Sequence, residues 1–117
     1  MALHSELPIY KVAYDLLGLI IALARNMPRD VKQQIGGALR EECVRITVLI
    51  FRANVSRDKA PHLLEVVERL QVAELLLRLS HDLRFIGQKQ YAAAIALTGQ
   101  IGKQANGWRK HSASPVA

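Results

Sequence analysis

The chain has 117 residues, a formal net charge of +6 and a pI near 9.9. This length suits one domain, which buries roughly two-thirds of the surface that its unfolded chain exposes. A single cysteine excludes an internal disulfide, and the uncharged run 16–24 is only nine residues long, against about 17 for a membrane span. Nothing near the start of the chain resembles an export signal. We therefore expect a soluble, cytoplasmic protein.

A composition rich in Leu, Ala, Ile, Arg and Gln, with few aromatic residues, is typical of all-helical proteins. The first helix is predicted over residues 8–27. Pro8 suits its first turn, because proline lacks an N–H that the start of a helix leaves unbonded. Asn26-Met27-Pro28 ends it, since the residue before a proline avoids the helical region. Beside its main apolar stripe, a second apolar flank is formed by Tyr14, Leu17 and Ile21.

The second helix is predicted over residues 29–54 and is unusually apolar. Ten of the sixteen residues from Ala38 to Ala53 are apolar, whereas a core-facing helix needs about three in seven. The surplus predicts a subunit contact in addition to the core. Gly36-Gly37 indicates close packing against a neighbouring helix; a phosphate-binding loop is rejected, because the flanking strand that it needs is absent. The residues expected in the core or in a subunit interface are Val44, Val48, Phe51 and, on the last helix, Trp108.

The third helix is predicted over residues 60–86, with Asp58 as its N-cap. Gly87 is expected to end it, after a buried set that closes with Leu83 and Ile86. Its charged residues of opposite sign fall four apart, which predicts a solvated, self-neutralising face. The expected ion pairs are Glu65–Arg69, Glu74–Arg78 and Arg78–Asp82.

The fourth helix is predicted over residues 88–109, and the tail 111–117 is expected to be disordered. Gly99 and Gly102 thin one side of this helix, which permits close approach of another helix. Four helices of about 20–27 residues with short links predict an all-α, up-down-up-down four-helix bundle in a single domain, 1–117. The surplus apolar surface on the first two helices would be exposed in a monomer, so we also expect self-association.

No pattern of residues in the sequence indicates catalysis. The four histidines are scattered, and no Glu-x-x-His pair or Cys/His spacing supports a metal site. Cys43 lies on the apolar side of its helix without a histidine at helical spacing, which favours a buried, inert thiol over a nucleophile. The acidic residues are mostly paired with arginines, so a carboxylate dyad is not expected. We therefore expect a protein that is not an enzyme, without cofactor, metal or small-molecule substrate.

The positive charge is concentrated in two segments. Residues 31–60 carry six Lys or Arg and three acidic residues, and residues 90–117 carry three Lys or Arg and no acidic residue. A local excess of this kind favours an anionic partner, and arginine suits phosphate because its planar guanidinium can bond two oxygens at once. The candidate nucleic-acid or partner-binding residues are Arg40, Arg45, Arg52, Arg57, Lys59, Lys103, Arg109 and Lys110.

Some of these residues have a purely structural alternative. Arg45 can pair with Glu41, one helical turn earlier. The stem of Arg52 can lie over the apolar surface while its charge reaches solvent. Trp108 is interpreted as a core or interface residue in preference to a platform for base stacking.

Four stretches of the chain together resemble the accessory variability determinant (Avd) family of diversity-generating retroelements. They are Met27-Pro28-Arg29 before a long apolar helix, Ile50-Phe51-Arg52-Ala53-Asn54, Glu74-Leu75-Leu76-Leu77-Arg78-Leu79, and the stretch 101–110, which contains Gly107-Trp108. The resemblance covers about residues 8–110. The Avd family belongs to a wider group of four-helix bundles that includes proteins encoded in intervening sequences of 23S ribosomal RNA.

The resemblance implies a homopentameric barrel of four-helix bundles with a positively charged surface. It also implies an accessory role without enzymatic activity: the protein binds RNA or DNA and the reverse transcriptase of the element, which copies a template into a variable gene with adenine-directed errors. One alternative is an intervening-sequence-type bundle that acts as a general RNA-binding module without a retroelement. Another is an adaptor whose basic residues bind an acidic protein. The third helix is charge-balanced, so we do not expect it to bind nucleic acid.

Overall fold

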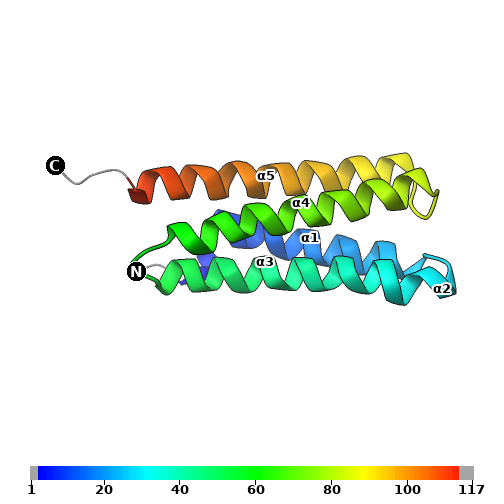
Figure 1. The fold of residues 1–117 in the computed structure, drawn as a ribbon, viewed down its shortest axis with the longest axis horizontal. Coiled ribbons are helices and arrows are strands. Elements are labelled where there is room, and N and C mark those ends of the chain that lie inside the picture. Colours follow the sequence, from blue (N-terminus) through cyan, green and yellow to red (C-terminus); the bar gives the residue numbers. More distant parts are fainter. Residues whose placement is uncertain (1–2, 114–117) are drawn as a thin grey trace.

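The computed structural model describes residues 3–113, which form a rod of 54 × 20 × 19 Å (Figure 1). All regular structure in this part of the chain is helical. The elements in chain order are η1 (His4–Glu6), α1 (Pro8–Arg25), α2 (Arg29–Val31), η2 (Lys32–Gly36), α3 (Gly37–Val55), α4 (Ala60–Asp82) and α5 (Gln88–Ala113).

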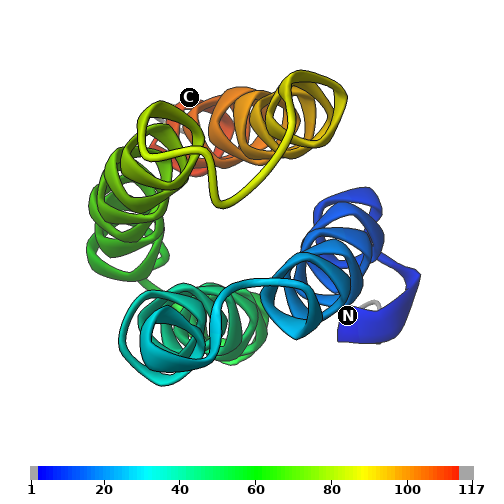
Figure 2. The same cartoon turned by 90° about the vertical axis from the view of Figure 1, so that its right-hand side faces the viewer.

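The four long helices stand at the corners of a square when the rod is viewed along its axis (Figure 2). α1 packs against α3 and α5, and α4 packs against the same two helices, so α1 and α4 are diagonally opposite. Short links make consecutive helices run in opposite directions. The expected all-α, up-down-up-down four-helix bundle is therefore confirmed. Within residues 3–113, no helix is both long enough and apolar enough to cross a membrane.

The core follows from apolar residues at three- and four-residue steps, which place one stripe of each helix on the bundle axis. In α1, for example, the stripe is Ile9, Ala13, Leu16, Ile20 and Leu23, and all five are buried. Each of the other long helices contributes a fully buried side chain of the same kind, at Ile46, Leu77 and Ile101.

The predicted second helix is helical without a gap from α2 to α3 but contains a wider turn. Residues 32–36 form π-helix between α2 and α3. Such π segments are rare and occur mostly as single turns inside α-helices. Here Gly36 is buried against α1, and a Cβ atom at this position would lie 2.9 Å from Cβ of Ala24. The close helix packing expected at Gly36 is thus confirmed, whereas a Cβ at Gly37 would meet nothing within 4 Å.

Gly36→Ala is therefore expected to destabilise the protein, and Gly37→Ala is its matched control. The added methyl group forces α1 and α3 apart, and overpacking of this kind costs about 1–3 kcal/mol. At Gly37 the methyl group has room, so the higher helix propensity of alanine adds roughly 0.5–1 kcal/mol of stability. Urea unfolding at one protein concentration measures both effects. Equal responses of the two variants would contradict the packing described here.

α4 ends at Asp82, four residues earlier than predicted, because the chain reverses at Arg84. Arg84 has a φ of 65°, in the left-handed region that non-glycine residues rarely adopt. The N–H of Phe85 donates to the carbonyl of Ser80 at 2.8 Å, and the N–H of Arg84 donates to the carbonyl of His81 at 3.0 Å. These two bonds define a Schellman turn. An arginine at its left-handed position gives no sequence signal for the helix end, whereas the expected breaker, Gly87, instead precedes α5.

Two further helix ends differ from the prediction. α5 continues to Ala113, so residues 111–113 are helical and the expectation of a disordered tail from 111 is wrong for them. No proline or glycine interrupts this stretch before Pro115. The rest of the predicted tail, 114–117, lies outside the described residues. α1 ends at Arg25, two residues before the predicted end.

Candidate nucleic-acid interface

The helix directions bring several of the candidate residues to one end of the bundle. α3 and α5 run the same way, so the last turns of both helices and the loop before α4 lie at the same end (Figure 1). We call this region the basic end; its members are Arg52, Arg57, Lys59, Arg109 and Lys110. Arg52, Arg57 and Lys110 are exposed, and Lys59 and Arg109 are half-buried.

The other three candidates lie outside the basic end. Lys103 is exposed on α5, about two turns before Lys110. Arg45 lies near the middle of α3, and Arg40 lies in its first turn, toward the opposite end of the rod. The eight candidate residues therefore do not form a single patch; five of them are together and Lys103 extends that group along α5.

Lys59 holds the end of α3 in place. Its Nζ donates to the carbonyl oxygens of Ala53 at 2.9 Å, Asn54 at 3.4 Å and Ser56 at 2.8 Å. These bonds satisfy carbonyls that the end of a helix leaves without partners, and they use all three donors of an ammonium group. Nζ also lies 5.7 Å from the centroid of the Trp108 ring, within the range of a cation–π interaction. Lys59 thus stabilises the basic end and has no N–H left for a phosphate.

Further hydrogen bonds fix the conformation of the loop that contains Arg57. The hydroxyl of Ser56 donates to the carbonyl of Arg52 at 2.6 Å and lies 3.0 Å from Nε2 of His62. The carboxylate of Asp58 accepts a hydrogen bond from the N–H of Ala60 at 3.3 Å. The N-cap position of α4 is nevertheless Lys59, one residue later than predicted, and no side chain caps it. Arg57 is therefore presented from a loop with several internal bonds.

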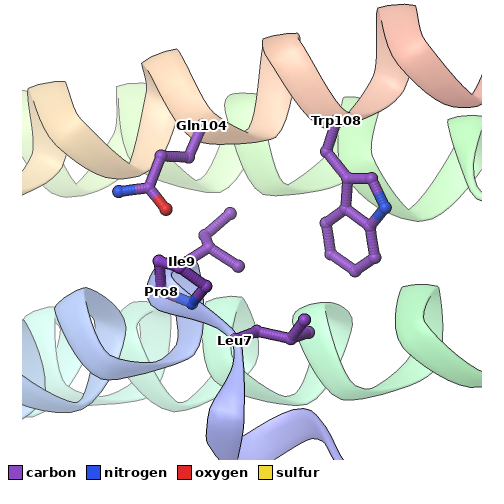
Figure 3. Close-up of a pocket in the computed structure, with 5 residues that line it drawn as sticks. All are labelled: Leu7, Pro8, Ile9, Gln104 and Trp108. Atoms are coloured by element: carbon purple, nitrogen blue, oxygen red, sulfur yellow. The ribbon is translucent and has the colours of Figure 1, made fainter. Parts of the chain in front are cut away.

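Trp108 lies at the seam between α5 and the start of α1. Its ring points toward Leu7, and the two residues line a pocket of about 190 Å³ together with Pro8, Ile9 and Gln104 (Figure 3). The side chain is half-buried and packs against the core. This placement agrees with a core residue in preference to an exposed base-stacking platform.

Arg45 pairs with a residue of α4 and not with Glu41. Its Nε and second guanidinium nitrogen lie 3.1 and 3.0 Å from the same carboxylate oxygen of Glu65. A second interhelical pair joins Arg69 of α4 to Glu42 of α3 at 3.1 Å. Because Glu65 and Arg69 both have partners on α3, the expected pair between them is wrong. A phosphate at Arg45 would have to compete with Glu65.

The other two expected pairs on α4 have different outcomes. Arg78 and Asp82 lie 3.8 Å apart, so this pair is confirmed, although both side chains are mostly exposed. Glu74 does not pair with Arg78 in this way; its carboxylate accepts a hydrogen bond from the buried hydroxyl of Thr98 on α5 at 2.7 Å. The polar residues of α4 thus join neighbouring helices as well as facing solvent.

Val44, Val48 and Phe51 lie on the outer side of α3 and not in the core of the bundle. Val44 is 45% exposed and Phe51 is 43% exposed, while Val48 is half-buried. The core role expected for these three residues is therefore wrong. Sequence reasoning missed a comparable set on α4, where Leu83 is 52% exposed instead of buried. The run Leu75-Leu76-Leu77 could have predicted an exposed leucine, because three consecutive residues of a helix cannot all face the core.

Cys43 is a free cysteine that is buried in α3. Burial, and secondarily the neighbouring charge of Glu42, raises the pKa of the Cys43 thiol to about 12. The thiol therefore stays protonated at neutral pH and is a poor nucleophile. Across residues 3–113, no three His, Cys, Asp or Glu side chains are grouped as a metal site would require.

An antiparallel four-helix bundle with exposed apolar side chains and a basic end defines the structural class of this protein. Within this class, the chain belongs to the bAvd-like family, whose model matches residues 8–112. This match confirms the resemblance to Avd proteins inferred from the four sequence stretches. No curated protein matches the chain.

Proposed function

We propose that this protein is the non-catalytic accessory protein of a diversity-generating retroelement, acting in the cytoplasm. It binds the template RNA, or the cDNA copied from it, and a reverse transcriptase, and thereby supports mutagenic retrohoming. Membership of the bAvd-like family over residues 8–112 is the observation that carries this proposal. In this role the protein works as a homo-oligomer, and we propose a pentamer.

The basic end supplies the nucleic-acid contacts in this proposal. Arg52, Arg57 and Lys110 are exposed there, and Lys103 adds a further charge along α5. Guanidinium groups suit phosphate oxygens because they offer paired donors in one plane. One chain provides few contacts, but an oligomer repeats them, so that weak single contacts combine through their high effective concentration.

The salt dependence of RNA binding tests this proposal. Contacts to phosphate release condensed counterions, so log K is expected to fall linearly with log salt, at about 0.7 per contact for a single strand and about 0.9 for a duplex. Fluorescence anisotropy with a labelled RNA measures the slope between low and moderate salt. A flat response would rule out binding through phosphate contacts.

The exposed apolar side chains support a second candidate function, that of a protein–protein adaptor. Ten large apolar residues are exposed in the described part of the chain, including Leu75 at 67% and Tyr14 at 64%. In this alternative the basic residues bind an acidic protein. It includes an intervening-sequence-type bundle without a retroelement partner, and a salt-independent or absent interaction with RNA would favour it.

A further inference from the structure

Two separate apolar faces lie on the outside of the bundle. The first, which we call the α1/α3 face, consists of Tyr14, Leu17, Ile21, Val44, Val48 and Phe51, of which four are between 43% and 64% exposed. The second, the α4 face, consists of Leu64, Leu75, Leu79 and Leu83, which are between 41% and 67% exposed. Contiguous apolar surface of this kind is rare on monomeric proteins unless a partner binds there.

The α1/α3 face is continuous across the two helices. A shallow pocket on α1 is lined by Tyr14, Leu17, Gly18 and Ile21. Ile21 also lines the next pocket, which reaches Arg40 on α3. Arg40 in turn lines a third pocket, with Val44 and Val48. The shared residues Ile21 and Arg40 show that the three hollows belong to one surface, into which side chains of a partner can insert.

The α4 face lies on the other side of the molecule. α1 and α4 are diagonally opposite in the bundle (Figure 2), and Leu75 and Leu79 are on the exposed side of α4. In a two-fold symmetric contact, the same patch is used by both subunits. Such a dimer would cover one of the two faces and leave the other in water. A head-to-tail contact covers both with a single type of interface.

We infer that the α1/α3 face of one copy binds the α4 face of the next copy. This inference rests on the self-association included in the proposed function, and it assigns the surfaces that meet. The occupant of each face is a second copy of this chain. Because the contact is heterologous, it repeats from copy to copy, and it forms a closed ring when the rotation between neighbouring copies closes.

Charge complementarity supports this pairing of faces. Arg40 at the edge of the α1/α3 face and Glu68 between the leucines of the α4 face are both exposed. Neither has an ion-pair partner among residues 3–113. The pairs Glu42–Arg69 and Arg45–Glu65 align α3 with α4, which places Glu68 on a level within about one helical turn of Arg40. When neighbouring copies are related by an axis parallel to the rod, residues at the same height along the rod face each other. Arg40 of one copy then pairs with Glu68 of the next copy.

A mixing experiment with two interface variants tests the inference. The double variant Ile21→Lys/Val44→Lys blocks the α1/α3 face, and Leu75→Lys/Leu79→Lys blocks the α4 face. All four positions are exposed, and lysine is a good helix former. Native mass spectrometry is expected to show each variant alone as a 13.0 kDa monomer. An equimolar mixture is expected to form a dimer with one copy of each variant, because only one intact pair of faces remains.

The control adds two lysines on the exposed side of α5, as Ala92→Lys/Ala96→Lys, and is expected to assemble like the unmodified protein. Four results would overturn the inference. They are a full-size oligomer of the α4-face variant, a mixture that stays monomeric, dissociation of the control variant, and a monomeric unmodified protein. Circular dichroism verifies that each variant is folded. If a double variant unfolds, a single variant of the same face replaces it: Ile21→Lys for the α1/α3 face or Leu75→Lys for the α4 face. RNA binding that does not depend on salt would end the proposed nucleic-acid role without changing this result.

Discussion

Replacing Arg52, Arg57, Lys103 and Lys110 with glutamine is expected to weaken RNA binding strongly and to flatten its salt dependence. These residues are the exposed bases at or beside the basic end. Each phosphate contact on a single strand contributes about 0.7 to the slope of log K against log salt, so losing four contacts lowers the slope by roughly 2.8 for each bound chain. Fluorescence anisotropy titrations at several salt concentrations measure both quantities.

A matched control removes the same charge from the other end of the rod. The residues Arg29, Arg78, Arg84 and Lys89 are all exposed and lie in α2, near or just after the C-terminal end of α4, and at the N-terminal end of α5. Their replacement with glutamine is expected to change RNA affinity much less. An equal loss in both variants would mean that net charge, and not the basic end, governs binding. Unchanged affinity in the first variant would favour the adaptor function.

Arg69→Met is expected to destabilise the protein by about 2 kcal/mol. The side chains of Arg69 and Glu42 are 33% and 17% exposed, and their pair is the most buried ion pair among the described residues. Removing one partner of a buried pair costs about 3–5 kcal/mol, because the remaining charge is uncompensated; partial exposure reduces that penalty here. One oxygen of Glu42 is already buried without a hydrogen-bond partner within residues 3–113, so no hydrogen bond to that oxygen offsets the loss of Arg69.

A double-mutant cycle separates the interaction energy of the Glu42–Arg69 pair from the cost of leaving one buried charge unpaired. Glu42→Leu combined with Arg69→Met is expected to be nearly neutral, since replacing both charges with apolar groups removes the penalty. The exposed pair Arg78–Asp82 is the control, with side chains 74% and 58% exposed, and its cycle should give about 0.5 kcal/mol or less. Denaturant unfolding at a fixed protein concentration measures all variants. Similar coupling energies for the two pairs would contradict a special role for the buried one.

The positions of the helices of this protein can largely be predicted from the local sequence. Apolar periodicity and the prolines at 8 and 28 located the four long helices, and short links between them were sufficient to predict antiparallel neighbours. The local sequence did not predict the π-helical turn before α3 or the end of α4 at Asp82. The first lies where Gly36 packs closely against Ala24 of another helix, and the second has an arginine in a backbone conformation that usually signals glycine.

The candidate site was less predictable than the fold, because charge partners are chosen between helices. Spacing within α4 predicted that Glu65 would pair with Arg69, but α3 offers both residues a closer partner. Likewise, nothing in the local sequence shows that Lys59 uses its three donors on the end of α3. Of the eight basic candidates, the structure therefore leaves fewer available for phosphate than composition alone suggested.

The sequence by itself determined the class of fold, the surplus of apolar residues and the excess of positive charge, because each follows from local periodicity or composition. The tertiary structure decided which of those residues remain available. Whether Val44 faces the core or solvent, and whether Arg45 is paired, depends on the rotation and level of one helix against another. These relations arise only when the helices pack, since they are set by contacts between residues far apart in the chain.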